Sequence, residues 1–190
     1  MRVFLVAGEA SGDALGGALM TGLKDLVPGG EFHGVGGPRM EVAGLTSLFP
    51  MEELSVMGLV EVLPKYRQLK RRIAETAEAV VRLRPDALIT IDSPDFCLRV
   101  ARAARAATPD LRTIHYVAPT VWAWRPGRAP RLAEVIDHVL ALFPLDPPSM
   151  EAAGLTCAFA GHPGPPPPRR PPRPPPPVPT CLPHSPLPPL

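Results

Sequence analysis

Short apolar runs alternate with helical patterns along most of the chain. The apolar runs predict strands at Val3–Ala7, Phe32–Val35, Ala87–Ile91, Arg112–Val117, His138–Leu142 and Cys157–Ala160. Between them, apolar positions recur at the i, i+3, i+4 spacing of amphipathic helices. These patterns predict helices at Ala14–Leu26, Tyr66–Arg84, Phe96–Ala107, Arg128–Ile136 and Asp146–Ala153. Strands that are apolar on both faces and separated by helices are typical of a parallel sheet covered on both sides, so the predicted fold class is α/β.

The loop after the first expected strand is rich in polar residues. It reads Gly8-Glu9-Ala10-Ser11-Gly12-Asp13 and matches neither the dinucleotide fingerprint nor a P-loop. Ser11 or Asp13 is a candidate cap for the following helix, which would explain one of them but not all three polar side chains. Two carboxylates at a helix N-terminus would repel phosphate, so we expect Glu9, Ser11 and Asp13 to bind a hydroxyl-rich group such as a sugar.

A second polar loop, Asp92-Ser93-Pro94-Asp95, follows the strand predicted at Ala87–Ile91. Ligands of open parallel sheets gather at the carboxyl ends of the strands. Asp95 and Ser93 are candidates for capping the next helix, whereas Asp92 comes too early for that role. A carboxylate at the end of a strand is suited to take a proton from an attacking alcohol, so Asp92 is the candidate general base.

Both tryptophans of the chain lie in a third loop, which ends with Trp122-Ala123-Trp124-Arg125. Nearby prolines argue against a regular element there. The two indoles either cover the end of the sheet or stack on a ligand, in which case Arg125 is placed to hold an anionic group. Trp122, Trp124 and Arg125 are therefore candidate substrate-binding residues.

An unusually apolar connection, Leu54–Pro64, precedes the basic run Lys65–Arg72. One interpretation is a buried helix with a solvated basic side. The other is an interfacial patch whose apolar residues enter a bilayer while its cations meet anionic lipid. The candidate membrane-contact residues are Val56, Met57, Val60, Val62, Leu63, Lys70 and Arg71.

Composition divides the chain of 190 residues in two. Residues 164–190 are proline-rich and predict a disordered or polyproline tail, whereas residues 1–163 predict one domain. The tail holds three arginines and no acidic residue; taking that +3 from the chain's +2 leaves −1 for the body, so basicity is no argument for nucleic acid. Three widely spaced cysteines fit a reducing cytoplasm, and the scattered histidines argue against a zinc site.

Taken together, these segments resemble the N-terminal half of the lipid-A-disaccharide synthase family. The resemblance is nearly continuous from Met1 to Pro163, and each motif alone would be weak. The residues that carry it are Gly8–Asp13, Gly36–Met40, Ser55–Gly58, Glu61–Leu63, Ile91–Phe96, His115–Arg125 and Phe159–Pro163.

The resemblance implies a GT-B glycosyltransferase, in which two Rossmann-like domains face each other across a cleft. It implies transfer of 2,3-diacylglucosamine from UDP onto 2,3-diacylglucosamine 1-phosphate, with inversion and without a metal or other cofactor. By analogy, Asp92 would deprotonate the acceptor hydroxyl, and Glu9, Ser11 and Asp13 would line the sugar site. Asp95 is a further candidate substrate-binding residue. The segment from Val56 to Arg72 would contact the inner membrane from the cytoplasmic side.

The chain departs from this family after His162-Pro163, where the proline tract begins. Family members are roughly twice as long, and the second half supplies most of the UDP site. This departure predicts a truncated or frameshifted form that is inactive by itself. Two alternatives stay open: another nucleotide-sugar enzyme on a similar sheet, such as an epimerase, and a non-catalytic binding module whose proline tail recruits a partner.

Overall fold

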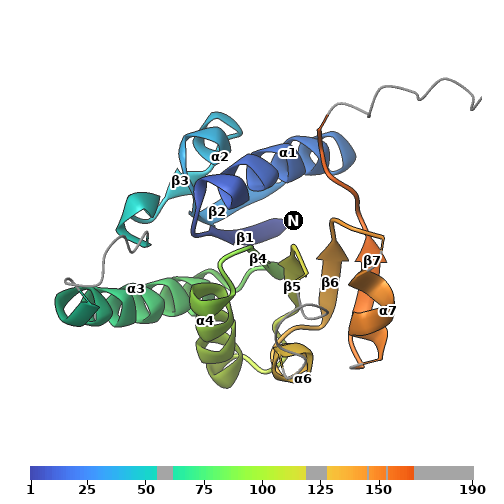
Figure 1. Cartoon of the computed structure of the whole chain (residues 1–190). Coiled ribbons are helices and arrows are strands. Elements are labelled where there is room, and N and C mark those ends of the chain that lie inside the picture. The colour runs from blue at the N-terminus through green and yellow to red at the C-terminus, as the bar shows by residue number, and fades with distance from the viewer. Residues whose placement is uncertain (55–61, 119–127, 145, 153, 165–190) are drawn as a thin grey trace, which may run out of the picture.

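The fold is a single parallel sheet with helices on both of its faces (Figure 1). The computed structural model describes residues 1–54, 62–118, 128–144, 146–152 and 154–164. Within these residues the strands are β1 (Arg2–Ala7), β2 (Glu31–Val35), β3 (Thr46–Ser47), β4 (Ala87–Ile91), β5 (Thr113–Tyr116), β6 (His138–Ala141) and β7 (Thr156–Phe159). The helices are α1 (Ala10–Leu26), α2 (Pro38–Val42), the 3-10 turn η1 (Met51–Leu54), α3 (Val62–Leu83), α4 (Pro94–Ala107), α6 (Arg128–Ala133) and α7 (Asp146–Glu151).

The strand order is β3-β2-β1-β4-β5-β6-β7, and every neighbouring pair is parallel. The chain first builds outward from β1 to β3 and then returns to place β4 on the other side of β1. This is the order of a Rossmann-like sheet, and the reversal puts a topological switch point between β1 and β4. Ligands of such sheets bind at the carboxyl ends of the strands that flank this point.

Alternate residues of β1 belong to two separate hydrophobic clusters. Phe4 and Val6 belong to the cluster that includes side chains from α3, α4, α6 and α7, whereas Val3, Leu5 and Ala7 belong to the cluster that includes side chains from α1 and α2. Figure 1 shows the corresponding layers, with α1 and α2 on one side of the sheet and α3, α4 and α6 on the other. Burial on both faces explains why the strands read as continuous apolar runs rather than as alternating ones.

The predicted α/β class and the Rossmann-like parallel sheet are confirmed. The five helices and six strands predicted from the pattern are present, but α1 begins at Ala10 rather than Ala14, and α6 ends at Ala133 rather than Ile136. The end of α6 has a local cause, because the backbone N–H groups of Val135 and Ile136 both donate to Leu132 O and turn the chain toward β6.

Three short elements between β2 and α3 were not predicted: α2, β3 and η1. Gly34 in β2 adopts φ +147°, and a Cβ there would overlap the Leu5 carbonyl oxygen of β1. Its backbone shape is therefore open to glycine and not to other residues. The conformation lets β1 and β2 approach closely at the point where β2 also pairs with β3.

Candidate active site at the carboxyl ends of β1 and β4

Asp92 directly follows β4 at the switch point, and its backbone is strained. Asp92 has φ +53° and Ser93 has φ +42°, values in the left-handed region that residues other than glycine rarely adopt. Such conformations cost about 1–3 kcal/mol each and cluster at functional sites. Pro94 follows as the first residue of α4, and a residue before proline is kept out of the right-handed helical region. The chain therefore turns sharply between β4 and α4, with the Asp92 carboxylate at the turn.

Hydrogen bonds from two loops fix the Asp92 carboxylate. The Ser11 hydroxyl, on the first turn of α1, donates to Asp92 Oδ2 at 3.0 Å. The backbone N–H of Ser93 donates to Asp92 Oδ1 at 2.9 Å. A third hydrogen bond joins the β4–α4 turn to the start of α1: the Ser93 hydroxyl donates to Glu9 Oε1 at 3.2 Å. A carboxylate oxygen can accept two hydrogen bonds, and each Asp92 oxygen accepts one here, so Asp92 keeps acceptor capacity for a further donor.

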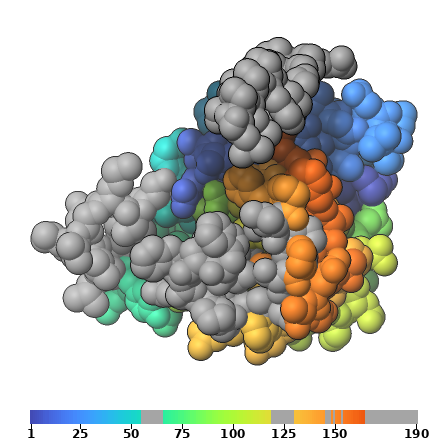
Figure 2. Space-filling model, turned by 45° about the vertical axis from the view of Figure 1, so that its right-hand side comes forward, coloured from blue at the N-terminus to red at the C-terminus, as the bar shows by residue number. Residues whose placement is uncertain are grey.

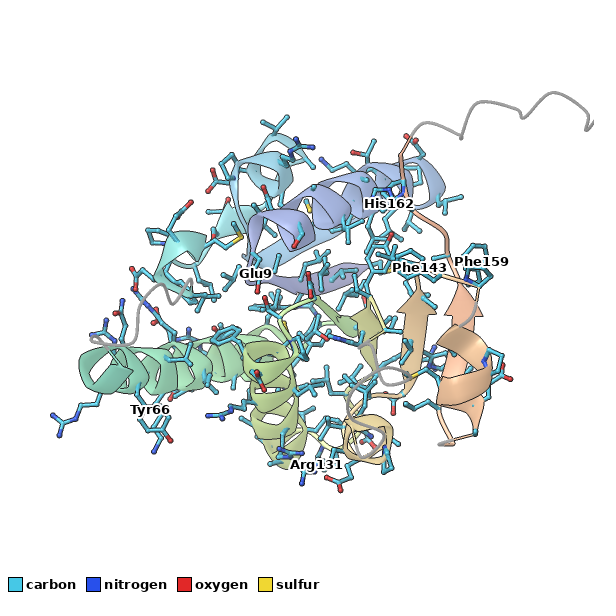
Figure 3. The ribbon with its side chains drawn as sticks, in the orientation of Figure 1. Glu9, Tyr66, Arg131, Phe143, Phe159 and His162 are labelled. Carbon is cyan, nitrogen blue, oxygen red and sulfur yellow. The ribbon has the colours of Figure 1, made fainter. Side chains whose placement is uncertain are left out.

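Glycines allow these two loops to come close together. A Cβ at Gly8 would lie 2.6 Å from Ser93 Oγ, and a Cβ at Gly12 would lie 3.2 Å from the Ile91 carbonyl oxygen. Any side chain at Gly8 would push Ser93 away from Glu9. The glycines of the first loop therefore serve the pairing of α1 with the β4–α4 turn (Figure 3, where Glu9 is labelled).

Asp13 lies against the N-terminus of α2, and its expected place in the sugar site stays a prediction. Its side chain is 4% exposed and caps the N-terminus of α2 across space. Oδ1 accepts from the backbone N–H groups of Gly37 and Met40, at 2.9 and 3.0 Å, and Oδ2 accepts from that of Arg39 at 3.0 Å. The prediction that Ser11 or Asp13 caps its own helix is wrong, because α1 begins at Ala10 with Glu9 at the N-cap position. The geometry gives Asp13 an architectural contact.

Substrate contact by the remaining predicted residues, Asp95 included, stays a prediction. Asp95 is exposed on the first turn of α4, where Ser93 holds the N-cap position without a side-chain capping bond. Trp122, Trp124 and Arg125 fall outside the described residues.

Two buried titratable groups lie near Asp92: His115 on β5 and Cys97 on α4. Burial lowers the pKa of His115 to about 4, opposed by the negative charge of Asp92, so the imidazole is neutral at pH 7. Burial likewise raises the pKa of the Cys97 thiol to about 12, which keeps Cys97 protonated and unreactive. Neither group was predicted to take part in the site. The sequence does place one polar residue inside each of two apolar strands, Thr90 in β4 and His115 in β5. That these two residues are paired depends on the strand register, which the sequence does not give.

A family model described as lipid-A-disaccharide synthetase matches residues 3–164. The chain belongs to this family. Curated relatives named lipid-A-disaccharide synthase include one from Ruegeria pomeroyi, 69% identical over 163 residues, and one from Rhodospirillum centenum, 56% identical over 164 residues. A relative from Pseudomonas aeruginosa is 53% identical over 163 residues.

The chain spans about two fifths of the length of these lipid-A-disaccharide synthases. The matches cover 86% of this chain, but only 40% of the Ruegeria pomeroyi protein and 41% of the Rhodospirillum centenum protein. Among solved structures, a UDP-GlcNAc 2-epimerase from Neisseria meningitidis bound to UDP-GlcNAc has a TM-score of 0.56 at 10% identity. That likeness covers 82% of this chain and 43% of the epimerase, and it supports the GT-B type of fold for this half.

A cavity of about 380 Å³ lies at the carboxyl ends of β2 and β3. Its lining includes Gly37, which the Asp13 carboxylate holds, and Met51 of η1. The same turn contributes Leu54, which lies 3.9 Å from the position of a Cβ at Gly8. The two carboxylates that line the cavity are Glu41 and Glu52. In this member of the lipid-A-disaccharide synthetase family, η1 thus contributes Met51 and Glu52 to the cavity and Leu54 to the surroundings of Gly8.

The expected membrane-contact segment is described only in part. Val56, Met57 and Val60 lie outside the described residues, and Val62 and Leu63 form the first turn of α3, where the backbone alone is described. Lys70 and Arg71 are exposed on α3. Among the described residues, no helix is both long and apolar enough to span a bilayer.

An ion-pair cluster joins η1 to α3 on either side of the undescribed residues 55–61. Arg72 Nε and Nη2 donate to the two oxygens of Glu53, at 2.8 and 2.7 Å, and Gln68 Nε2 adds a bond of 2.7 Å. The hydrogen bond from Arg72 lowers the pKa of Glu53. The Arg72 guanidinium also lies 4.3 Å from the centre of the Phe49 ring. On the same helix, Tyr66 projects outward and lies beneath Lys70 Nζ at 4.9 Å (Figure 3).

Proposed function

We propose that this chain forms the acceptor-side half of a lipid A glycosyltransferase. The reaction is transfer of 2,3-diacylglucosamine from UDP onto 2,3-diacylglucosamine 1-phosphate, which gives the disaccharide and UDP. The observation that carries the proposal is the Asp92 carboxylate, held on a strained turn at the switch point by Ser11 Oγ and Ser93 N. Family membership supports the substrate class.

In this proposal Asp92 takes the proton of the acceptor hydroxyl as its oxygen attacks the anomeric carbon of the donor. The new glycosidic bond forms on the face opposite the departing UDP, so the configuration inverts. The bonds from Ser11 and Ser93 fix the direction of the carboxylate, which leaves a lone pair of Asp92 for the acceptor hydroxyl. Glu9, which receives one bond from Ser93, has its second oxygen for a sugar hydroxyl.

A chimera tests the proposed reaction. Residues 1–164 of this chain are joined to the part of the Ruegeria pomeroyi relative that follows its matched region, and disaccharide and UDP are measured by mass spectrometry. We expect the chimera to form both products, and the 190-residue chain to form neither, because the donor site belongs to the second half. A folded chimera that binds UDP yet forms no disaccharide would contradict the proposal.

We further propose that the start of α3 and the segment before it contact an anionic membrane surface from the cytoplasmic side, as a peripheral contact. Lys70 and Arg71 are exposed next to Tyr66, on a helix whose other face is buried. Replacing both with serine should weaken sedimentation with vesicles containing anionic phospholipid by several-fold at low salt, because each cation near such a surface contributes about 1 kcal/mol.

The matched control for the membrane proposal is the double change Arg99→Ser and Arg112→Ser. It removes the same charge from exposed positions on α4 and before β5. We expect this control to leave vesicle binding nearly unchanged. Equal losses of vesicle binding in the two variants would mean that net charge alone explains the effect. No loss of binding in either variant would favour the other interpretation, a buried helix with a solvated basic side.

A further inference from the structure

Three strained residues stand at the ends of two neighbouring strands. Asp92 and Ser93 follow β4, and Val117 follows β5 with φ +80°. A positive φ is especially unfavourable for a β-branched residue such as valine. Strained backbone of this kind persists only where the surrounding structure fixes it. The contacts that hold the ends of β4 and β5 therefore determine the shape of the Asp92 turn.

Backbone bonds tie these ends to each other. Asp92 N donates to Tyr116 O of β5 at 3.0 Å, and Val117 N donates to Leu140 O of β6 at 2.9 Å. The position of Asp92 thus depends on where β5 ends. A shift of β5 along β4 would move the Tyr116 carbonyl and with it the backbone of Asp92.

A buried side-chain bond lies just before these turns. Thr90 of β4 faces His115 of β5 in the strand register, and Thr90 Oγ1 lies 2.8 Å from His115 Nδ1. The same hydroxyl lies 3.2 Å from the Ile114 carbonyl oxygen. Because a hydroxyl has one proton and a carbonyl only accepts, both contacts are satisfied when Thr90 donates to Ile114 and Nδ1–H donates to Thr90. His115 Nε2 is then the unprotonated nitrogen.

That nitrogen has no hydrogen-bond partner among the described residues. His115 is 1% exposed, and its neighbours in the sheet register are Thr90 on β4 and Val139 on β6. An unpaired buried polar atom lowers stability, so packing alone would favour an apolar side chain at this position. His33 Nε2 also lacks a hydrogen bond, but that side chain is 44% exposed.

We propose that His115 is a positioning residue for Asp92. Its hydrogen bond to Thr90, called the lock below, fixes the end of β5 against β4. The lock keeps Asp92 and Ser93 in the left-handed conformation that directs the carboxylate toward Ser11. The lock itself is a property of this chain, whereas its part in turnover rests on the proposed function.

The first test uses the 190-residue chain and NMR backbone shifts of Asp92 and Ser93, which report a left-handed conformation. His115→Phe and Thr90→Val remove the lock, and we expect both to move these shifts away from the left-handed range. His115→Asn retains a donor near the position of Nδ1 and should restore them. His138→Phe, at an exposed position on β6, is the matched control and should leave them unchanged.

Stability separates positioning from a purely structural role. In His115→Phe, Thr90 keeps its bond to Ile114 and the unpaired nitrogen is gone, so the unfolding midpoint should equal or exceed that of the unchanged chain. Altered Asp92 shifts in a stable variant would support the proposal. Unaltered shifts in folded Thr90→Val and His115→Phe would overturn it, and so would shifts that move only in proportion to lost stability.

The second test measures turnover in the chimera. His115→Phe should lower kcat by about 10–100-fold with KM within about twofold, because a small misplacement of a reacting group costs rate rather than binding. His115→Asn should recover most of kcat. If His115→Phe and Thr90→Val displace the Asp92 shifts but the unchanged chimera shows no turnover, the proposed function is wrong and the structural role of the Thr90–His115 bond remains. A normal kcat in His115→Phe would overturn the positioning role.

Discussion

Asp92 and Asp13 show how one residue type takes two roles within a single site. Asp13 lies on the first turn of α1, and Asp92 lies in the turn after β4. Asp92 keeps free acceptor capacity, whereas Asp13 is surrounded by three backbone donors. The difference lies in what faces each carboxylate. Asp13 meets the N-terminus of a short helix, whereas Asp92 meets one serine hydroxyl and its own neighbour's N–H.

His115 gives a residue-scale prediction about pH. Burial lowers its pKa from 6.5 to about 4. Between these two pH values the unfolded chain therefore binds a proton at His115 that the folded chain does not. The stability that comes from the neutral imidazole is complete above pH 6.5 and is lost as pH falls to about 4. The expected loss is on the order of 3 kcal/mol.

Urea unfolding at pH 7.5, 5.5 and 4 checks this prediction. The free energy of unfolding of the unchanged chain, minus that of His115→Phe, should fall across this range, since carboxylates that titrate in both chains cancel. His138→Phe serves as the control and should show a flat difference. A flat difference for His115→Phe would mean that the imidazole is not buried in the neutral form.

At the scale of elements, α2 depends on a carboxylate from α1. Asp13→Ala leaves the N–H groups of Gly37, Arg39 and Met40 without their acceptor, so we expect a loss of about 2–3 kcal/mol. Asp25→Ala, at an exposed position on α1, is the control and should change stability by less than about 0.5 kcal/mol. Denaturant unfolding compares the two variants. Similar small effects in both would contradict the architectural role of Asp13.

The same contact explains why part of this region escaped prediction from the sequence. The long strands were predictable because burial on both faces leaves a continuous apolar run, as in Ala87–Ile91, whose predicted bounds equal those of β4. The helix α2 has five residues, too few for a periodic pattern, and its cap lies at Asp13, 24 residues before Gly37. No local signal links the two positions.

The candidate site was predictable in its position and not in its connections. Glu9, Ser11 and Asp92 follow strands, and the sheet topology brings them together at the switch point. The crossing pattern, in which Ser11 bonds Asp92 and Ser93 bonds Glu9, depends on the close approach at Gly8 and on positive φ at Asp92. These features arise from tertiary packing, so periodicity does not report them.

At the scale of the molecule, β7 is the outermost described strand of the sheet on the side opposite β3. Together with α7 it lies at the surface in Figure 2 (orange). Phe143 and Phe159 are 59% and 56% exposed there, at the carboxyl ends of β6 and β7 (Figure 3). The curated relatives continue for more than half of their length beyond this match. The proposed division into a domain of residues 1–163 and a proline-rich tail of residues 164–190 stays a prediction.

The kcat of the Asp92→Asn chimera tests whether Asp92 activates the acceptor hydroxyl. We expect a loss of about 10²–10⁴-fold with an unchanged unfolding midpoint, while Asp110→Asn, at an exposed position after α4, retains full activity. Near-normal turnover in a folded Asp92→Asn chimera would contradict the account and place the base elsewhere.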